Sequence, residues 1–69
     1  MSEDISIEVR QAILEQKLAF WKQTAWSLGI DARLAGVIES AEMLENATAQ
    51  LKQALKMVDL LEKELAGLK

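Results

Sequence analysis

The sequence predicts an all-α protein built as an antiparallel two-helix hairpin. Proline is absent and only three glycines occur among the 69 residues, so few positions interrupt a helix. The strong helix formers Ala, Leu, Glu, Lys and Gln dominate the composition. Apolar residues recur at intervals of three, four and seven, which is the spacing of one helix face. We therefore treat residues 1–69 as a single helical domain.

The predicted turn lies at residues 29–31. Gly29 suits the left-handed residue that ends many helices, and Asp31 suits the N-cap of a following helix. This places the first helix at about residues 6–28 and the second at about residues 32–66. A linker of this length holds two helices antiparallel and adjacent.

The apolar positions of the first helix follow alternating steps of four and three residues. The stripe that they form is expected to face the second helix and contains Ile7, Leu14, Leu18, Trp21, Ala25 and Leu28, with Gln11 as its polar break. Acidic residues near the start complement the helix dipole, namely Glu3, Asp4 and Glu8. The alternating pattern of residues 5–9 also fits a short strand, but an isolated strand would have no sheet to join.

The second helix carries a seven-residue repeat that is typical of a coiled coil. One position of the repeat contains Val37, Leu44, Leu51, Val58 and Leu65. The other contains Ser40, Ala47, Ala54, Leu61 and Leu68. The small residues would let a neighbouring backbone approach closely, and we expect Gly36 at such a contact with the first helix.

Unequal helix lengths lead to the prediction of a partner. The first helix, of about 22 residues, would span roughly 33 Å, and the second, of about 34–37 residues, roughly 50–55 Å. Folding back would place Trp21 near Glu39, facing the small residues that follow Gly36, and Ile7 near Gln53. Beyond Gln53 the second helix would overhang, leaving uncovered Leu55, Val58, Leu60, Leu61, Leu65 and Leu68. An apolar row of this length normally marks an interface.

The first helix also shows apolar residues away from its main stripe. Val9, Ile13 and Phe20 project from the opposite side, and a helix that is apolar on two faces is usually packed between neighbours. We expect a homodimer that forms a four-helix bundle, because two-fold dimers are the commonest oligomers. A different helical protein could cover the same residues and is the alternative. The predicted partner interface consists of Val9, Ile13, Phe20, Trp26, Leu55, Val58, Leu61, Leu65 and Leu68.

Charge disfavours nucleic acid and membranes as partners. The net charge is −3 and the sequence pI is about 4.8. Lys52, Lys56 and Lys63 form a weak basic strip, with Arg10 expected nearby, but acidic residues interrupt it and no aromatic residue interleaves it. Binding of RNA or DNA is therefore a minor alternative. No apolar run approaches the ~18 residues of a membrane-spanning helix, and a Glu-rich polar face disfavours membrane-surface binding.

The residue types disfavour catalysis and metal binding. The chain has no His and no Cys, so zinc and copper lack their usual ligands and a hydroxyl lacks a histidine base. Glu39, Glu42 and Glu45 recur every three residues, but carboxylate metal sites in helical bundles also use Glu-x-x-His. We interpret these three as a solvated acidic face opposite Lys17 and Lys22. We expect no enzyme activity and no cofactor.

The small size and the lack of cysteine complete the interpretation. A single core in so short a chain seldom supplies more than ~3–5 kcal/mol, and without disulfides oligomerisation is the remaining source of stability. The absence of cysteine and the acidic N-terminus indicate a cytoplasmic protein without a signal peptide. We expect a non-enzymatic interaction module, such as a homodimeric adaptor, chaperone-like or regulatory protein. An obligate subunit of a hetero-complex is the alternative.

Overall fold

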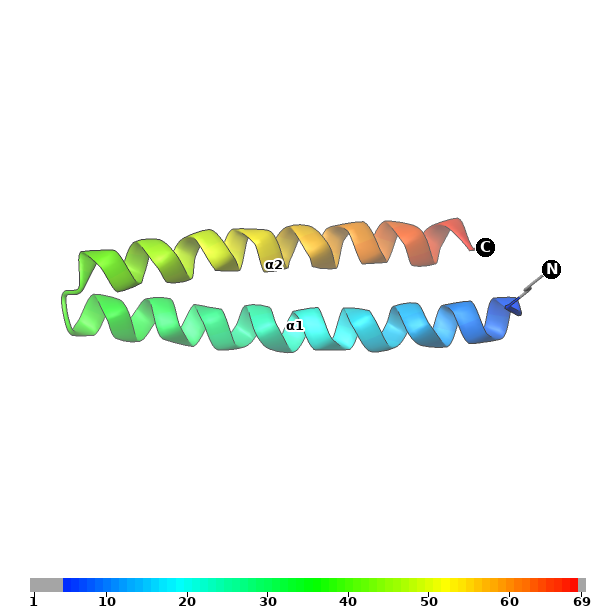
Figure 1. The fold of residues 1–69 in the computed structure, drawn as a ribbon, viewed down its shortest axis with the longest axis horizontal. Coiled ribbons are helices and arrows are strands. Elements are labelled where there is room, and N and C mark those ends of the chain that lie inside the picture. Colours follow the sequence, from blue (N-terminus) through cyan, green and yellow to red (C-terminus); the bar gives the residue numbers. More distant parts are fainter. Residues whose placement is uncertain (1–4, 69) are drawn as a thin grey trace.

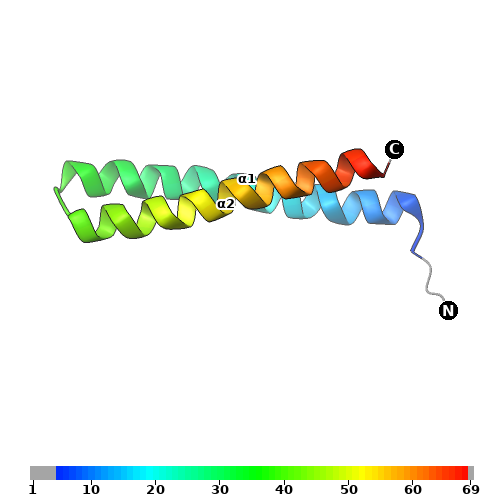
Figure 2. The same cartoon turned by 90° about the horizontal axis from the view of Figure 1, so that it is seen from above.

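A computed structural model describes residues 5–68 as two α-helices joined by a short turn (Figure 1). Helix α1 spans Ile7–Val37 and helix α2 spans Ala41–Gly67. The helices run antiparallel and side by side, and they cross at a shallow angle when seen from above (Figure 2). The expected all-helical hairpin is confirmed. The acidic residues Glu3 and Asp4, expected to complement the dipole of the first helix, lie outside the described residues.

The two helices have similar lengths, and the prediction of a short first and a long second helix is wrong. Helix α1 has 31 residues and helix α2 has 27. Residues 29–31, predicted to form the turn, lie inside α1. The end of α2 lies beside the start of α1, so the predicted overhang beyond Gln53 is also wrong (Figure 1).

The turn lies nine residues further along the chain, at residues 38–40. Glu39 adopts the left-handed conformation with φ 59°. Its N–H donates to the Gly36 carbonyl at 3.1 Å, and the Ser40 N–H donates to the Ala35 carbonyl at 3.0 Å. These two bonds form a Schellman motif, which satisfies carbonyls that the end of a helix leaves without partners.

A serine caps the start of each helix. The Ser40 Oγ accepts a hydrogen bond from the Met43 N–H at 3.2 Å, and the Ser6 Oγ accepts one from the Val9 N–H at the same distance. Serine is a preferred N-cap because its side chain satisfies an otherwise unpaired N–H of the first turn. Ser40 therefore begins α2, and Asp31 does not.

Helix α1 continues through Gly29 because its apolar stripe continues as well. Leu28 and Ala32 keep the four–three spacing on either side of Gly29, and Ala35 follows at 1% exposure. A glycine inside a helix costs about 1 kcal/mol relative to alanine, which burial of the stripe outweighs. The close contact predicted at Gly36 is wrong, since a Cβ there would meet nothing within 4 Å.

Replacing Gly29 with alanine should stabilise the protein by about 1 kcal/mol, because helical backbone favours alanine and a Cβ there meets nothing within 4 Å. Urea denaturation followed by circular dichroism would measure the change in the free energy of unfolding. In a hairpin that turned at residues 29–31, the same substitution would strain a left-handed residue and destabilise the protein. The sign of the change therefore tests where the chain turns.

The helices meet along a narrow row of mostly small residues. The buried side chains are Ala25, Ala35, Ala47, Ala54 and Leu61. Half-buried residues border them on both helices, among them Leu14, Leu18, Trp21, Leu28, Leu51, Val58, Leu65 and Leu68. The predicted stripe and the predicted seven-residue repeat thus face each other, as expected. Three apolar members of these two patterns are exposed: Ile7 at 56%, Leu44 at 40%, and Val37, which ends α1, at 73%.

The hairpin is elongated for its mass. It measures 53 × 21 × 13 Å, with a radius of gyration of 16.0 Å, whereas a compact domain of this length would have about 11 Å. Its accessible surface is 5340 Å², against about 4,300 Å² for a typical folded monomer of 7.7 kDa. Two helices alone therefore leave unusually much surface uncovered.

Candidate interaction surface

The nine residues predicted to contact a partner fall into two groups. Leu61 is buried, and Val58, Leu65 and Leu68 are half-buried. Helix α1 is long enough to cover this end of α2, so their assignment to an uncovered overhang is wrong. The remaining five are exposed: Val9, Ile13, Phe20, Trp26 and Leu55. Contact with a partner stays a prediction for all nine.

Most of the exposed apolar residues of α1 gather on a second stripe, whose edge residues Ile13 and Leu34 also border hollows beside α2. We call this stripe the outer face. Its residues follow the same four–three spacing as the inner stripe, about half a turn away. They are Val9, Ile13, Phe20, Ile30, Leu34 and Val37. Ile30 is half-buried and the others are between 40% and 73% exposed. Exposed polar residues separate the two ends of this face, namely Gln16, Gln23 and Ser27.

The sequence-based prediction found only half of the outer face. It included Val9, Ile13 and Phe20 but ended the first helix at Leu28. The second half was missed and consists of Ile30, Leu34 and Val37. The sequence spacing could have indicated these three residues. The steps from Phe20 to Ile30, Leu34 and Val37 are ten, four and three residues, which keep to one helix face.

Two rows of residues border the outer face along its length, each repeating every seven residues. The charged row contains Arg10, Lys17, Thr24 and Asp31, and is basic in its N-terminal half and acidic near its end. The Ala/Trp row contains Ala12, Ala19, Trp26 and Arg33. Trp26 is 73% exposed. The outer face itself has no charged residue.

Helix α2 differs from α1 because its outward side is polar. Exposed charged residues cover it, among them Glu42, Glu45, Lys52, Lys56, Asp59 and Lys63. Lys63 Nζ lies 3.1 Å from Asp59 Oδ2, one turn earlier on the same helix. Helix α2 is thus amphipathic with a solvated back, whereas α1 is apolar on both sides.

An aromatic pair lies at the middle of the hairpin. The rings of Phe20 and Trp21 meet edge to face, with centroids 5.4 Å apart. Trp21 lines a shallow hollow with Gln53, Met57 and Leu60 of α2. The expected contact of Trp21 with the small residues after Gly36 is therefore wrong, because the turn lies further along the chain.

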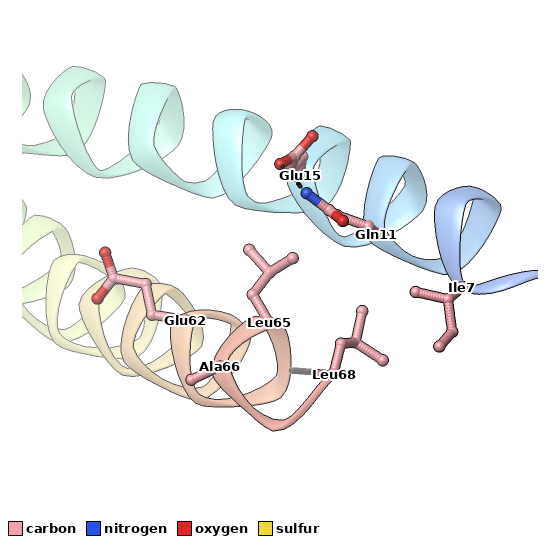
Figure 3. A pocket seen from close by; sticks show the side chains of 7 residues that line it. All are labelled: Ile7, Gln11, Glu15, Glu62, Leu65, Ala66 and Leu68. Carbon is pink, nitrogen blue, oxygen red and sulfur yellow. Dashed lines mark hydrogen bonds between the residues drawn. The ribbon is translucent and has the colours of Figure 1, made fainter.

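A second hollow, of about 410 Å³, opens where the start of α1 meets the end of α2 (Figure 3). Ile7 and Leu68 point toward each other across it, and Leu65 points toward α1. The Gln11 Nε2 donates to Glu15 Oε2 at 3.1 Å on its rim. Its lining offers amide and carboxylate groups but no nucleophile paired with a base.

The register of the hairpin also changes the expected charge contacts. Lys22 Nζ lies 3.9 Å from Glu62 Oε2. The prediction that the acidic face of residues 39–45 lies opposite Lys22 is therefore wrong. Arg10 lies beside Glu64 and Leu68 at the rim of a hollow, which means that it does not extend the basic strip of α2. The predicted contacts were wrong because they assumed a turn at residues 29–31.

Two further findings apply to residues 5–68. Neither helix has a stretch that is long and apolar enough to cross a membrane. No three acidic side chains in this part of the chain gather where they could hold a metal ion.

Comparison with known protein families, with curated protein sequences and with solved structures gives no match. The outer face of α1 is thus the feature that most distinguishes this hairpin.

Proposed function

We propose that the protein is a small, non-enzymatic helical interaction module that associates with a second copy of itself. The observation that supports this most strongly is the outer face of α1, with five large apolar residues between 40% and 73% exposed. Full burial of such a side chain contributes roughly 1.5–3 kcal/mol relative to full exposure. Exposed apolar residues that gather on one helix face over this length are typical of an interface.

The difference between the helices supports a central place for α1. A helix that is apolar on two sides is usually packed between neighbours, and one with a polar back lies at the surface. The surface in excess of that expected for a folded monomer is about 1,000 Å², and each partner in a standard interface buries about 800 Å². One further copy would therefore suffice to cover the outer face. Such an assembly suits a cytoplasmic adaptor, chaperone-like or regulatory protein.

Sedimentation equilibrium of the purified chain, from low to high micromolar concentration, tests the proposal. We expect the mass to rise from 7.7 kDa toward twice that value. Phe20→Glu should weaken self-association at least about 10-fold, because it buries an unpaired carboxylate. Ala49→Glu adds the same charge on the exposed side of α2 and should leave association unchanged. A well-folded monomer at every concentration would refute the proposal.

A different helical protein is the second candidate for covering the outer face. The polar residues Gln16, Gln23 and Ser27 in its centre favour this alternative, because they reduce the apolar area available for self-pairing. It predicts that the isolated chain is loosely packed and only weakly associated. A sharp cooperative melt with a concentration-dependent midpoint would contradict it.

A further inference from the structure

We infer that the second copy lies antiparallel along the outer face, so that the two α1 helices form the centre of the assembly and the α2 helices lie outside. This inference rests on the proposed function, because it presupposes self-association through α1. It names the orientation and the register of the partner. The charges, the side-chain sizes and the length of α1 each support it.

The charged row supports an antiparallel orientation. In an antiparallel helix pair each bordering row faces the same row of the other copy, and charges in these rows set partner orientation. Arg10 of one copy would then lie opposite Asp31 of the second copy, and two-fold symmetry makes this contact twice. In a parallel pair the charged row would instead face the Ala/Trp row, which has no acidic residue. Arg10 and Lys17 would then meet no opposite charge on the second copy.

The Ala/Trp row gives the same orientation from side-chain size. An antiparallel pair places Ala19 opposite Trp26 of the second copy, so the largest exposed side chain of α1 meets one of the smallest. Close packing requires this kind of match. A parallel pair would bring Trp26 beside Asp31 and would leave the carboxylate against an indole ring. The two bordering rows thus independently favour the antiparallel arrangement.

The length of α1 fixes the register. Full overlap of two copies of Ile7–Val37 places the two-fold axis near Trp21 and Lys22. Along the outer face this register pairs Val9 with Leu34, Ile13 with Ile30, Gln16 with Ser27, and Phe20 with Gln23. Polar residues then mostly meet each other, as buried polar groups require. This register leaves Val37 opposite Ser6, just outside α1. A shift of seven residues would pair Val37 with Ile13, but it would bring Gln16 against Leu34, leave Val9 uncovered and shorten the overlap of the two helices.

Two charge reversals test the orientation directly. Arg10→Glu and Asp31→Lys should each weaken self-association about 10-fold at low salt, because each creates two like-charge contacts per dimer. An equal mixture of the two variants should recover wild-type affinity, since in the mixed dimer both contacts are again between opposite charges. Glu45→Lys makes the same charge change on the exposed side of α2 and should have no effect. Sedimentation with one fluorescently labelled chain would measure each affinity.

Engineered disulfides provide a second measurement, since the natural chain has no cysteine. Val9→Cys mixed with Leu34→Cys should form a covalent heterodimer on oxidation, whereas Val9→Cys alone should not cross-link. Two results would overturn the antiparallel arrangement and leave self-association standing. One is cross-linking of Val9→Cys alone. The other is a mixture of the two charge variants that does not recover wild-type affinity although the wild-type chain dimerises. A wild-type chain that stays monomeric would overturn both.

Discussion

The substitution Leu61→Ala is expected to bring the hairpin close to unfolding at ambient temperature. Leu61 is the only large apolar side chain that is buried among residues 5–68, at 7% exposure. Removing a buried leucine side chain to alanine costs about 2–5 kcal/mol. That loss is comparable with the ~3–5 kcal/mol that a core of this size supplies. Thermal unfolding followed by circular dichroism should show a midpoint lower by at least about 10 °C.

Leu60 offers a matched control for this substitution. It is the neighbouring residue and is 45% exposed, so Leu60→Ala removes the same atoms from a partly solvated position. We expect a loss below about 1 kcal/mol. Equal losses at the two positions would contradict the packing of α2 on α1. No loss at Leu61 in a monomeric sample would mean that this end of α2 is uncovered after all.

Periodicity explains why the sequence predicted the inner contact well. A stripe at steps of four and three residues shows which side of a helix is buried, whatever the register of the partner. Leu14, Leu18, Trp21 and Leu28 could therefore be assigned to the stripe before the turn was known. The repeat through Ala47, Ala54 and Leu61 was equally clear. All of these residues are buried or half-buried.

The predicted position of the turn was wrong because the residue types at Gly29 and Asp31 indicated a helix end, whereas the apolar stripe continued past them. Gly29 and Asp31 have the preferred residue types for a helix end and a cap. The residue that turns the chain is Glu39, at φ 59°, and a glutamate gives no sign of a left-handed conformation. Ser40 was the better candidate for the N-cap, since serine is preferred there. It was assigned to the seven-residue repeat instead, because its spacing fits that repeat.

The shift of the turn changes the reason why this protein should need a partner. With the turn at residues 38–40, the end of α2 packs on the start of α1 and no longer requires another chain. The same shift adds Ile30, Leu34 and Val37 to the outer face. The expected partner surface is therefore the outer face of α1, in which Gln16, Gln23 and Ser27 interrupt the apolar residues. The outward side of α2 is mostly charged.

The composition of the core links self-association to stability. Among residues 5–68, four of the five buried residues are alanines, which bury little apolar area each. Any free energy gained by covering the outer face would add directly to the stability of the hairpin, because the partner binds only the folded chain. The thermal midpoint should consequently rise with protein concentration, and the unpaired hairpin should be marginal.

The alanines also determine how closely the two helices approach, and the substitution Ala54→Leu tests this role. Ala54 is fully buried, at 0% exposure, so a leucine there must displace α1 or adopt a strained rotamer. Overpacking of this kind costs about 1–3 kcal/mol, and the thermal midpoint should fall by roughly 5 °C or more. Ala49→Leu adds the same volume on the exposed side of α2 and should change stability by less than about 0.5 kcal/mol. Equal thermal midpoints of the two variants would refute the close approach of the helices at Ala54. They would also refute the register of α2 on α1 from which the outer face was defined.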